Sequence, residues 1–270
     1  MKNIILYFGS FNPIHQGHIA LAEYVLTQEL CDEVILIVSP QNPLKSAETQ
    51  APELARFEMA EIACKASAFP DRIKPSAVEF ILPRPSYTID TLRYLTENHG
   101  HEMHFSILMG SDLIPQLAQW KAYESILNDY PIFVYPRRGQ VVDQYLDHLT
   151  LLKDAPLYDF SSTQIRETLA RGGDVSNQLS AGVLRYIQEK GLWTPAAYIA
   201  GLSARLELDP TNADLYVERG KWHYRRNDWG SALNDFNHAV RLDPEHGEAH
   251  QFVDMVQEIL QFRYTDLYNP

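Results

Sequence analysis

Short, continuous hydrophobic runs alternate with segments whose apolar residues recur at helical spacing. The strand-like runs lie at residues 4–8, 33–40, 73–82, 102–110 and the end of 125–139. The helical patterns lie at residues 18–30, 53–67, 88–100 and 162–173. Continuous apolar strands are typical of a parallel sheet that helices cover on both faces. This alternation predicts an α/β fold, a Rossmann-like doubly wound parallel sheet.

The pattern becomes all-helical near Pro195. Leu-Asp-Pro occurs at 208–210 and again at 242–244, a shift of 34 residues, which is the period of a tetratricopeptide repeat. We therefore predict two domains, a catalytic domain at 1–194 and a small all-α, tetratricopeptide-like domain at 195–270.

The predicted tail contains one recognisable repeat, whereas repeat arrays usually need about three or more to bury a continuous core. Its apolar helix faces include Trp222, Trp229, Phe236 and Phe252. We expect another surface to cover them: the catalytic domain, a second copy in a homo-oligomer or a partner protein, of which the first two are favoured.

The composition is that of a soluble globular protein, with 45% hydrophobic and 21% charged residues among 270. The net charge of −12 argues against a nucleic-acid-binding surface, which would be basic. No apolar run approaches the ~20 residues that span a membrane, and the first run is too short for a signal peptide. We expect a cytoplasmic protein in which Cys31 and Cys64 are buried, reduced thiols.

Polar motifs follow four of the predicted strands. They read GSFNPIHQGH, SPQNPLK, GSD and YPRRG. Ligands of doubly wound sheets bind beyond the carboxyl ends of the strands, so these loops are expected to meet at one rim.

His15 and His18 lie three residues apart at a predicted helix start, where N–H groups and the helix dipole attract anions. They are candidate hydrogen-bond donors to phosphate oxygens, and Gly9 lets a ligand approach the backbone. The alternative of two surface histidines stays open. A metal site is less favoured, because no cysteine or third histidine lies at ligand spacing.

A second helix start reads SSTQIR, in which Ser161 and Gln164 have capping-box spacing. The box alone indicates only that a helix begins, but its hydroxyls and Arg166 could hold phosphate. The chain contains neither GxxxxGK[ST] nor GxGxxG, and no nucleophilic triad stands out.

GSFNPIHQGH resembles the HxGH element of the nucleotidyltransferases, and SSTQIR resembles their ISSTxIR element. With SYTIDTL and QWK, residues 1–194 resemble a bacterial nicotinate-nucleotide adenylyltransferase. Phe8, Asn12 and Phe160 depart conservatively from the family pattern. Leu44 stands where a histidine often precedes the lysine, which puts phosphate affinity at that loop in doubt.

The resemblance implies transfer of the adenylyl group of ATP to nicotinate mononucleotide, giving deamido-NAD and pyrophosphate. The attacking phosphate oxygen is already ionised, so catalysis would rest on positioning and charge stabilisation. Mg²⁺ is expected to arrive with ATP and to have few protein ligands.

The resemblance also implies roles for individual residues. The catalytic residues would be His15, His18 and Arg166. ATP would contact Gly9, Ser10, Phe11, Gly110, Asp112, Ser161, Ser162 and Thr163. The acceptor would contact Asn42, Lys45, Tyr87, Thr88, Trp120 and Arg137. Alternatively, Trp120 is a packing residue and Lys45 a solvated loop cation.

Two rival functions stay open. The first is the same chemistry on nicotinamide mononucleotide or phosphopantetheine. The second is an inactive nucleotide-binding domain that serves as the base of an interaction tail, although every phosphate-facing position is retained.

Overall fold

The computed structural model describes residues 1–40 and 50–266, which divide into two compact units. The first unit contains Met1–Arg166 and Val175–Tyr186, and the second contains Glu167–Asp174 and the chain from Ile187 onward. The division therefore runs through two helices, α6 (Ser162–Ala170) and α7 (Ala181–Lys190).

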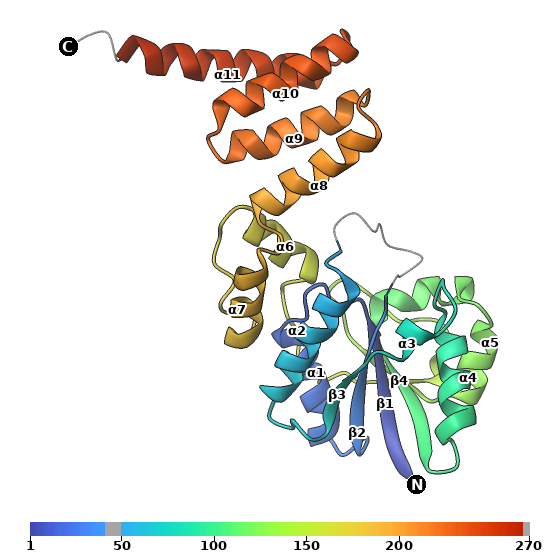
Figure 1. Cartoon of the computed structure of the whole chain (residues 1–270). Helices are drawn as coiled ribbons and strands as arrows, with labels where there is room; N and C mark the ends of the chain where they lie inside the picture. The colour runs from blue at the N-terminus through green and yellow to red at the C-terminus, as the bar shows by residue number, and fades with distance from the viewer. Residues whose placement is uncertain (41–49, 267–270) are drawn as a thin grey trace. The chain divides into compact units, whose positions relative to one another are not determined.

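A six-stranded, fully parallel sheet forms the first unit, in the order β3-β2-β1-β4-β5-β6. Its strands are β1 (Lys2–Gly9), β2 (Glu33–Val38), β3 (Ile73–Ser76), β4 (Met103–Gly110), β5 (Ile132–Tyr135) and β6 (Leu149–Leu151). Helices α1 (Gln16–Thr27) and α2 (Glu53–Lys65) lie to one side, and α4 (Thr88–His99) and α5 (Tyr123–Asp129) to the other (Figure 1). The predicted doubly wound fold is confirmed.

The strand order reverses between β1 and β4, which are neighbours in the sheet. Their core residues are almost completely buried, for example Ile4, Leu6 and Ile107 at 1% exposure or less. Loops at the carboxyl ends of these strands diverge in such a sheet and leave a crevice for ligand. The GSFNP loop follows β1, and the short 3₁₀ segment η2 (Ser111–Gln119) follows β4.

Two sequence predictions need correction. Residues 73–82 are not one strand, because β3 ends at Ser76 and Val78–Ile81 forms the short helix α3. β3 is an edge strand that contains Pro75, which has no N–H to donate. β6, the opposite edge, is only three residues long and was not predicted.

The second unit contains α8 (Pro195–Leu208), α9 (Ala213–Arg225), α10 (Trp229–Leu242) and α11 (Gly247–Asp266). The Leu-Asp-Pro triplets fall where α8 and α10 end. The side chains of Asn212 and Asp228 cap α9 and α10 by accepting from the N–H groups of Leu215 and Ser231. No helix in the described ranges is both long and apolar enough to cross a bilayer.

The aromatic residues of the tail cover one another. Phe236 and Phe252 stack at 4.8 Å between ring centroids, and Tyr198 and Trp222 stack at 4.3 Å. Trp229 packs edge-on against Tyr224. These contacts bury Trp222 and Phe236 within the tail and leave Trp229 and Phe252 only partly buried, so fewer of the aromatic residues need an outside surface than the sequence predicts.

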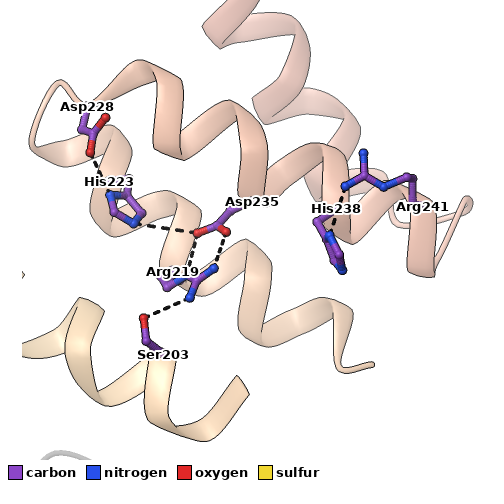
Figure 2. Close-up of polar contacts among 7 residues, drawn as sticks. All are labelled: Ser203, Arg219, His223, Asp228, Asp235, His238 and Arg241. Carbon is purple, nitrogen blue, oxygen red and sulfur yellow. Dashed lines mark hydrogen bonds and ion pairs between the residues drawn. The ribbon is translucent and has the colours of Figure 1, made fainter. Parts of the chain in front are cut away.

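A partly buried ion pair joins α9 to α10 (Figure 2). The Arg219 guanidinium donates to both carboxylate oxygens of Asp235, at 2.8 and 2.6 Å, and to Ser203 Oγ on α8 at 2.9 Å. The Asp235 side chain is 8% exposed, and His223 approaches it at 3.9 Å. These contacts tie three helices together through one guanidinium.

Asp235→Asn should lower the free energy of unfolding of the tail by about 2 kcal/mol, because the partly buried Arg219 guanidinium loses its charged hydrogen-bond partner. Urea unfolding followed by tryptophan fluorescence measures the change. Asp254→Asn, at an exposed position of α11, should change stability by less than about 0.5 kcal/mol. Equal effects of the two substitutions would refute the structural importance of the pair.

Candidate active site

Two cavities open at the carboxyl end of the sheet. The first, of about 430 Å³, we call the histidine cavity. It is lined by Tyr7, Phe8, Gly9, Ser10, Phe11, Asn12, His15, His18, Gln50, Asp112, Leu113, Tyr135, Arg137, Ser161, Ser162, Thr163 and Arg166. The second, of about 240 Å³, we call the tryptophan cavity. Its wall includes Ser39, Glu79, Ser86, Tyr87, Thr88, Trp120 and Lys121, and it shares Phe8, Gly9 and Leu113 with the first.

The two histidines begin helix α1. His15 is the N-cap residue, and its backbone N–H donates to His18 Nδ1 at 3.1 Å. Because Nδ1 accepts, the proton of a neutral His18 ring lies on Nε2, where it is a donor. The two imidazoles stack at 3.6 Å between centroids. The local sequence therefore fixes both the tautomer and the orientation of His18.

His15 is buried, with only 6% of its surface exposed, and its Nδ1 has no partner within the described part of the chain. Burial, aided by the positive charge of Arg137, lowers the pKa of His15 to about 3. The ring is therefore neutral at physiological pH.

Helix α6 brings the second motif to the same cavity. The Ser161 N–H donates to Gln164 Oε1 at 2.8 Å, and the Gln164 N–H donates back to Ser161 Oγ at 3.3 Å. This confirms the predicted capping box. Ser162 Oγ donates to the Pro13 carbonyl at 2.9 Å, so the helix start is fastened to the GSFNP loop.

Arg166, one turn along α6, reaches the same loop. Its Nη1 donates to the Asn12 carbonyl at 2.7 Å, and its Nη2 donates to Thr163 Oγ1 at 3.3 Å. The guanidinium is thereby held on the wall of the histidine cavity.

Arg137 supplies a second cation to this cavity. Its Nη2 donates to the phenol oxygen Oη of Tyr135 at 3.2 Å, and Tyr135 Oη lies 3.0 Å from Tyr7 Oη. Its Nε lies 3.6 Å from Asp112 Oδ1. Arg137, which the resemblance assigns to the acceptor, lies on the wall of the histidine cavity and not on that of the tryptophan cavity.

Gly110 leaves space for Asp112. A Cβ at Gly110 would lie 2.3 Å from Asp112 Oδ1 and 3.2 Å from the Tyr135 ring. Any larger residue would displace the carboxylate from the cavity wall. Gly110 does not itself line the cavity, but its lack of a side chain is required for the position of Asp112.

A buried arginine supports the loops at the carboxyl end of the sheet. Arg56, on α2, is 1% exposed. Its guanidinium donates to four backbone carbonyls, at 2.6–3.1 Å, those of Ser10, Ser39, Pro40 and Ala51. These carbonyls belong to the loops that follow β1 and β2 and to the start of α2. Nothing in the sequence singles out Arg56, since it lies at a position that any amphipathic helix could fill with a polar residue.

The tryptophan cavity lies at the start of α4. Tyr87 is the N-cap residue of that helix, and no side chain caps it. Lys121 forms an ion pair with Asp90 at 2.8 Å and lies over the Tyr87 ring at 4.9 Å. Trp120, Tyr87 and Thr88 thus line one cavity, together with a buried carboxyl group, Glu79, that the sequence analysis did not select.

The structure brings most predicted residues to these two walls. The predicted contacts at Asn42 and Lys45, and the departure at Leu44, lie outside the described residues. Tyr7 and Tyr135 were not selected, and only their position at the ends of β1 and β5 could have suggested them. Within the described ranges, no group of three or more His, Cys, Asp or Glu side chains could hold a metal ion.

Comparison with known proteins identifies the family. The cytidylyltransferase-like family matches residues 6–168. A protein of Bacteroides fragilis named probable nicotinate-nucleotide adenylyltransferase is 40% identical over 183 residues, 67% of this chain and 89% of its own length. A protein of the same name from Flavobacterium psychrophilum is 36% identical over 191 residues, 70% of this chain and 97% of its own length. The chain belongs to the nicotinate-nucleotide adenylyltransferase family.

Solved structures agree at the level of the fold. A Plasmodium falciparum nicotinic acid mononucleotide adenylyltransferase complexed with NaAD is 21% identical to this family member, with a TM-score of 0.62. The alignment covers 72% of this chain and 98% of that one. At this identity the similarity establishes the nucleotidyltransferase fold.

Acid should destabilise the protein through His15. The pKa of His15 is about 3 in the folded chain, below its ordinary value of 6.5, so between these values only the unfolded chain binds the proton. Stability therefore falls as pH falls from 6.5 toward 3, by about 2 kcal/mol at pH 5 from this residue.

Urea unfolding of the wild type and His15→Gln at pH 7 and pH 5 measures this contribution. The variant should lose about 2 kcal/mol less than the wild type. His101→Gln, whose side chain is 71% exposed, should behave as the wild type. A His15→Gln protein with the full wild-type pH dependence would contradict the neutral state assigned to His15.

Proposed function

We propose that this chain transfers the adenylyl group of ATP to nicotinate mononucleotide, releasing pyrophosphate and forming deamido-NAD. One observation carries the proposal. A cavity of imidazoles, guanidiniums and hydroxyls meets a cavity with an indole wall at Phe8, Gly9 and Leu113. Phosphates in the first and a pyridine ring in the second would bring the two reactants together at this junction.

In the histidine cavity the residues act by position and charge. The Nε2–H of His18 donates to the α-phosphate, where negative charge develops, and its orientation is already fixed by the His15 N–H. Arg166 and Arg137 offset the charge of the β- and γ-phosphates, with help from Ser162 and Thr163. Since the acceptor phosphate is already ionised, no general base is needed.

In the tryptophan cavity the start of α4 binds the acceptor ring. The first N–H groups of a helix are unpaired and favour an anion, here the nicotinate carboxylate at Thr88. The Trp120 indole stacks on the electron-poor ring. An amide would not gain from the helix dipole in the same way, which favours the acid acceptor over nicotinamide mononucleotide.

Mg²⁺ would arrive with ATP. Asp112 is the only carboxylate on the described wall of the histidine cavity, and it already lies close to Arg137. This donor set fits an ion held chiefly by phosphate oxygens and water, as Mg²⁺ usually is. When bound, the ion would neutralise phosphate charge, while Asp112 would also contact the ATP ribose.

Initial rates of pyrophosphate release with ATP and each acceptor test the function. Nicotinate mononucleotide should be the preferred substrate over nicotinamide mononucleotide and phosphopantetheine. No pyrophosphate with any of the three at high enzyme concentration would favour the inactive nucleotide-binding alternative instead.

His18→Ala should lower kcat by about 10²–10³, because it removes one oriented transition-state donor. ATP binding, measured by calorimetry, should weaken much less. His101→Ala, at an exposed site, is the matched control and should retain wild-type rates. A His18→Ala enzyme within about threefold of the wild type would show that the assigned role is wrong.

Trp120→Ala should raise KM for nicotinate mononucleotide and leave KM for ATP nearly unchanged, because the indole lines only the tryptophan cavity. Steady-state kinetics on protein verified as folded by circular dichroism measures both constants. Trp229→Ala in the tail should change neither. If KM for ATP rises as much as KM for the acceptor, Trp120 is a packing residue.

For the rest of the chain we propose a tetratricopeptide-like tail without catalytic residues, in a cytoplasmic enzyme. The 34-residue repeat of Leu-Asp-Pro and the capped pair α9–α10 support the repeat assignment. Assembly of copies through the tail also stays a proposal.

A further inference from the structure

The tryptophan cavity contains a buried carboxyl group that the reaction described above does not use. Glu79, on α3, is 2% exposed. Its Oε1 accepts from Thr91 Oγ1, one turn into α4, at 2.9 Å. Its Oε2 is buried and has no hydrogen-bond partner in the part of the chain that the structure describes. The side chain lines the cavity beside Thr88 and Trp120.

No positively charged side chain on the described wall of the cavity forms an ion pair with Glu79. The other titratable groups that line the cavity are Tyr87 and Lys121, and Lys121 is paired with Asp90. Burial raises the pKa of Glu79 and outweighs the nearby hydroxyls of Ser39 and Thr91, which favour the ionised form. A second wall atom, Ser86 Oγ, is also buried without a partner among the described residues.

An acceptor carboxylate in this cavity would meet the Glu79 carboxyl group in a space of about 240 Å³. Two ionised carboxylates that share a small, poorly solvated site repel each other, and one proton held between them removes the repulsion. The open Oε2 of Glu79 is the atom that can carry this proton and lacks a partner on the described wall.

We propose that Glu79 is neutral in the acceptor complex and donates a hydrogen bond from Oε2 to the carboxylate of nicotinate mononucleotide. The inference rests on the function proposed above. Glu79 is then a specificity residue, since an ionised glutamate would accept from the NH₂ of an amide acceptor but repel the acid. The Thr91 bond holds the carboxyl group beneath the first turn of α4, where the acceptor carboxylate is expected.

Glu79→Gln and Glu79→Ala of the full chain test the proposal, with Glu97→Gln on the exposed face of α4 as the matched control. Calorimetry measures the affinity for nicotinate mononucleotide in the presence of the α,β-methylene analogue of ATP, which cannot react. The side-chain amide introduced by Glu79→Gln reproduces the donor of a neutral carboxyl group, so the affinity of this variant should stay within about threefold of the wild type. Glu79→Ala should bind about tenfold more weakly.

Infrared difference spectra of the same complexes report protonation directly. Wild type and Glu97→Gln should show the carbonyl band of a protonated carboxyl group in the acceptor complex, and Glu79→Gln should lack it. If the wild-type complex lacks this band, or if Glu79→Gln binds as weakly as Glu79→Ala, the proposal is overturned. Failure of the wild type to bind nicotinate mononucleotide at all would instead overturn the proposed function.

Discussion

The loops at the carboxyl end of the sheet depend on the hydrogen bonds that the Arg56 guanidinium donates. A buried charge is expensive unless its donors are satisfied, and here they are satisfied by backbone carbonyls of Ser10, Ser39, Pro40 and Ala51. The charge therefore stabilises the fold only when the loops after β1 and β2 are both in place. Ser10, in the loop after β1, lines the histidine cavity, and Ser39, in the loop after β2, lines the tryptophan cavity. One side chain beneath the surface therefore couples the geometry of both.

The histidine cavity combines neutral imidazole rings with positively charged guanidinium groups. His15 is neutral because it is buried near Arg137, and His18 receives a backbone N–H at Nδ1. The positive charge comes from Arg137 and Arg166, which remain ionised at any accessible pH. Such a wall offers oriented donors and fixed cations before the nucleotide arrives, so little reorganisation is needed in the transition state.

The sequence was informative where the chemistry is local. The spacing of His15 and His18 and the capping box at Ser161 and Gln164 each belong to a single helix start. The sequence motif therefore predicts the local geometry in both cases. The alternating hydrophobic runs predicted the sheet for the same reason. Edge elements were less predictable, because β6 is too short to leave a periodic signal.

Non-local contacts were beyond the sequence. The polarity of Arg56 and Glu79 is that of solvent-exposed residues, and only the packing of distant segments shows that both are buried. The end of β5 predicted that Arg137 reaches the rim, but not which cavity it enters. The tail was assigned to helices correctly, yet the mutual cover of its aromatic residues depends on how its helices pack.

The protonation state of the two histidines tests the account most directly. Two-bond ¹H–¹⁵N spectra of the free, full-length protein report it, with the two rings assigned among the 10 histidines by His15→Gln and His18→Gln. At pH 7 the account predicts a neutral His18 protonated at Nε2, and a His15 that stays neutral as the pH is lowered to 5. An imidazolium at His15 at pH 7, or a His18 ring protonated at Nδ1, would contradict it.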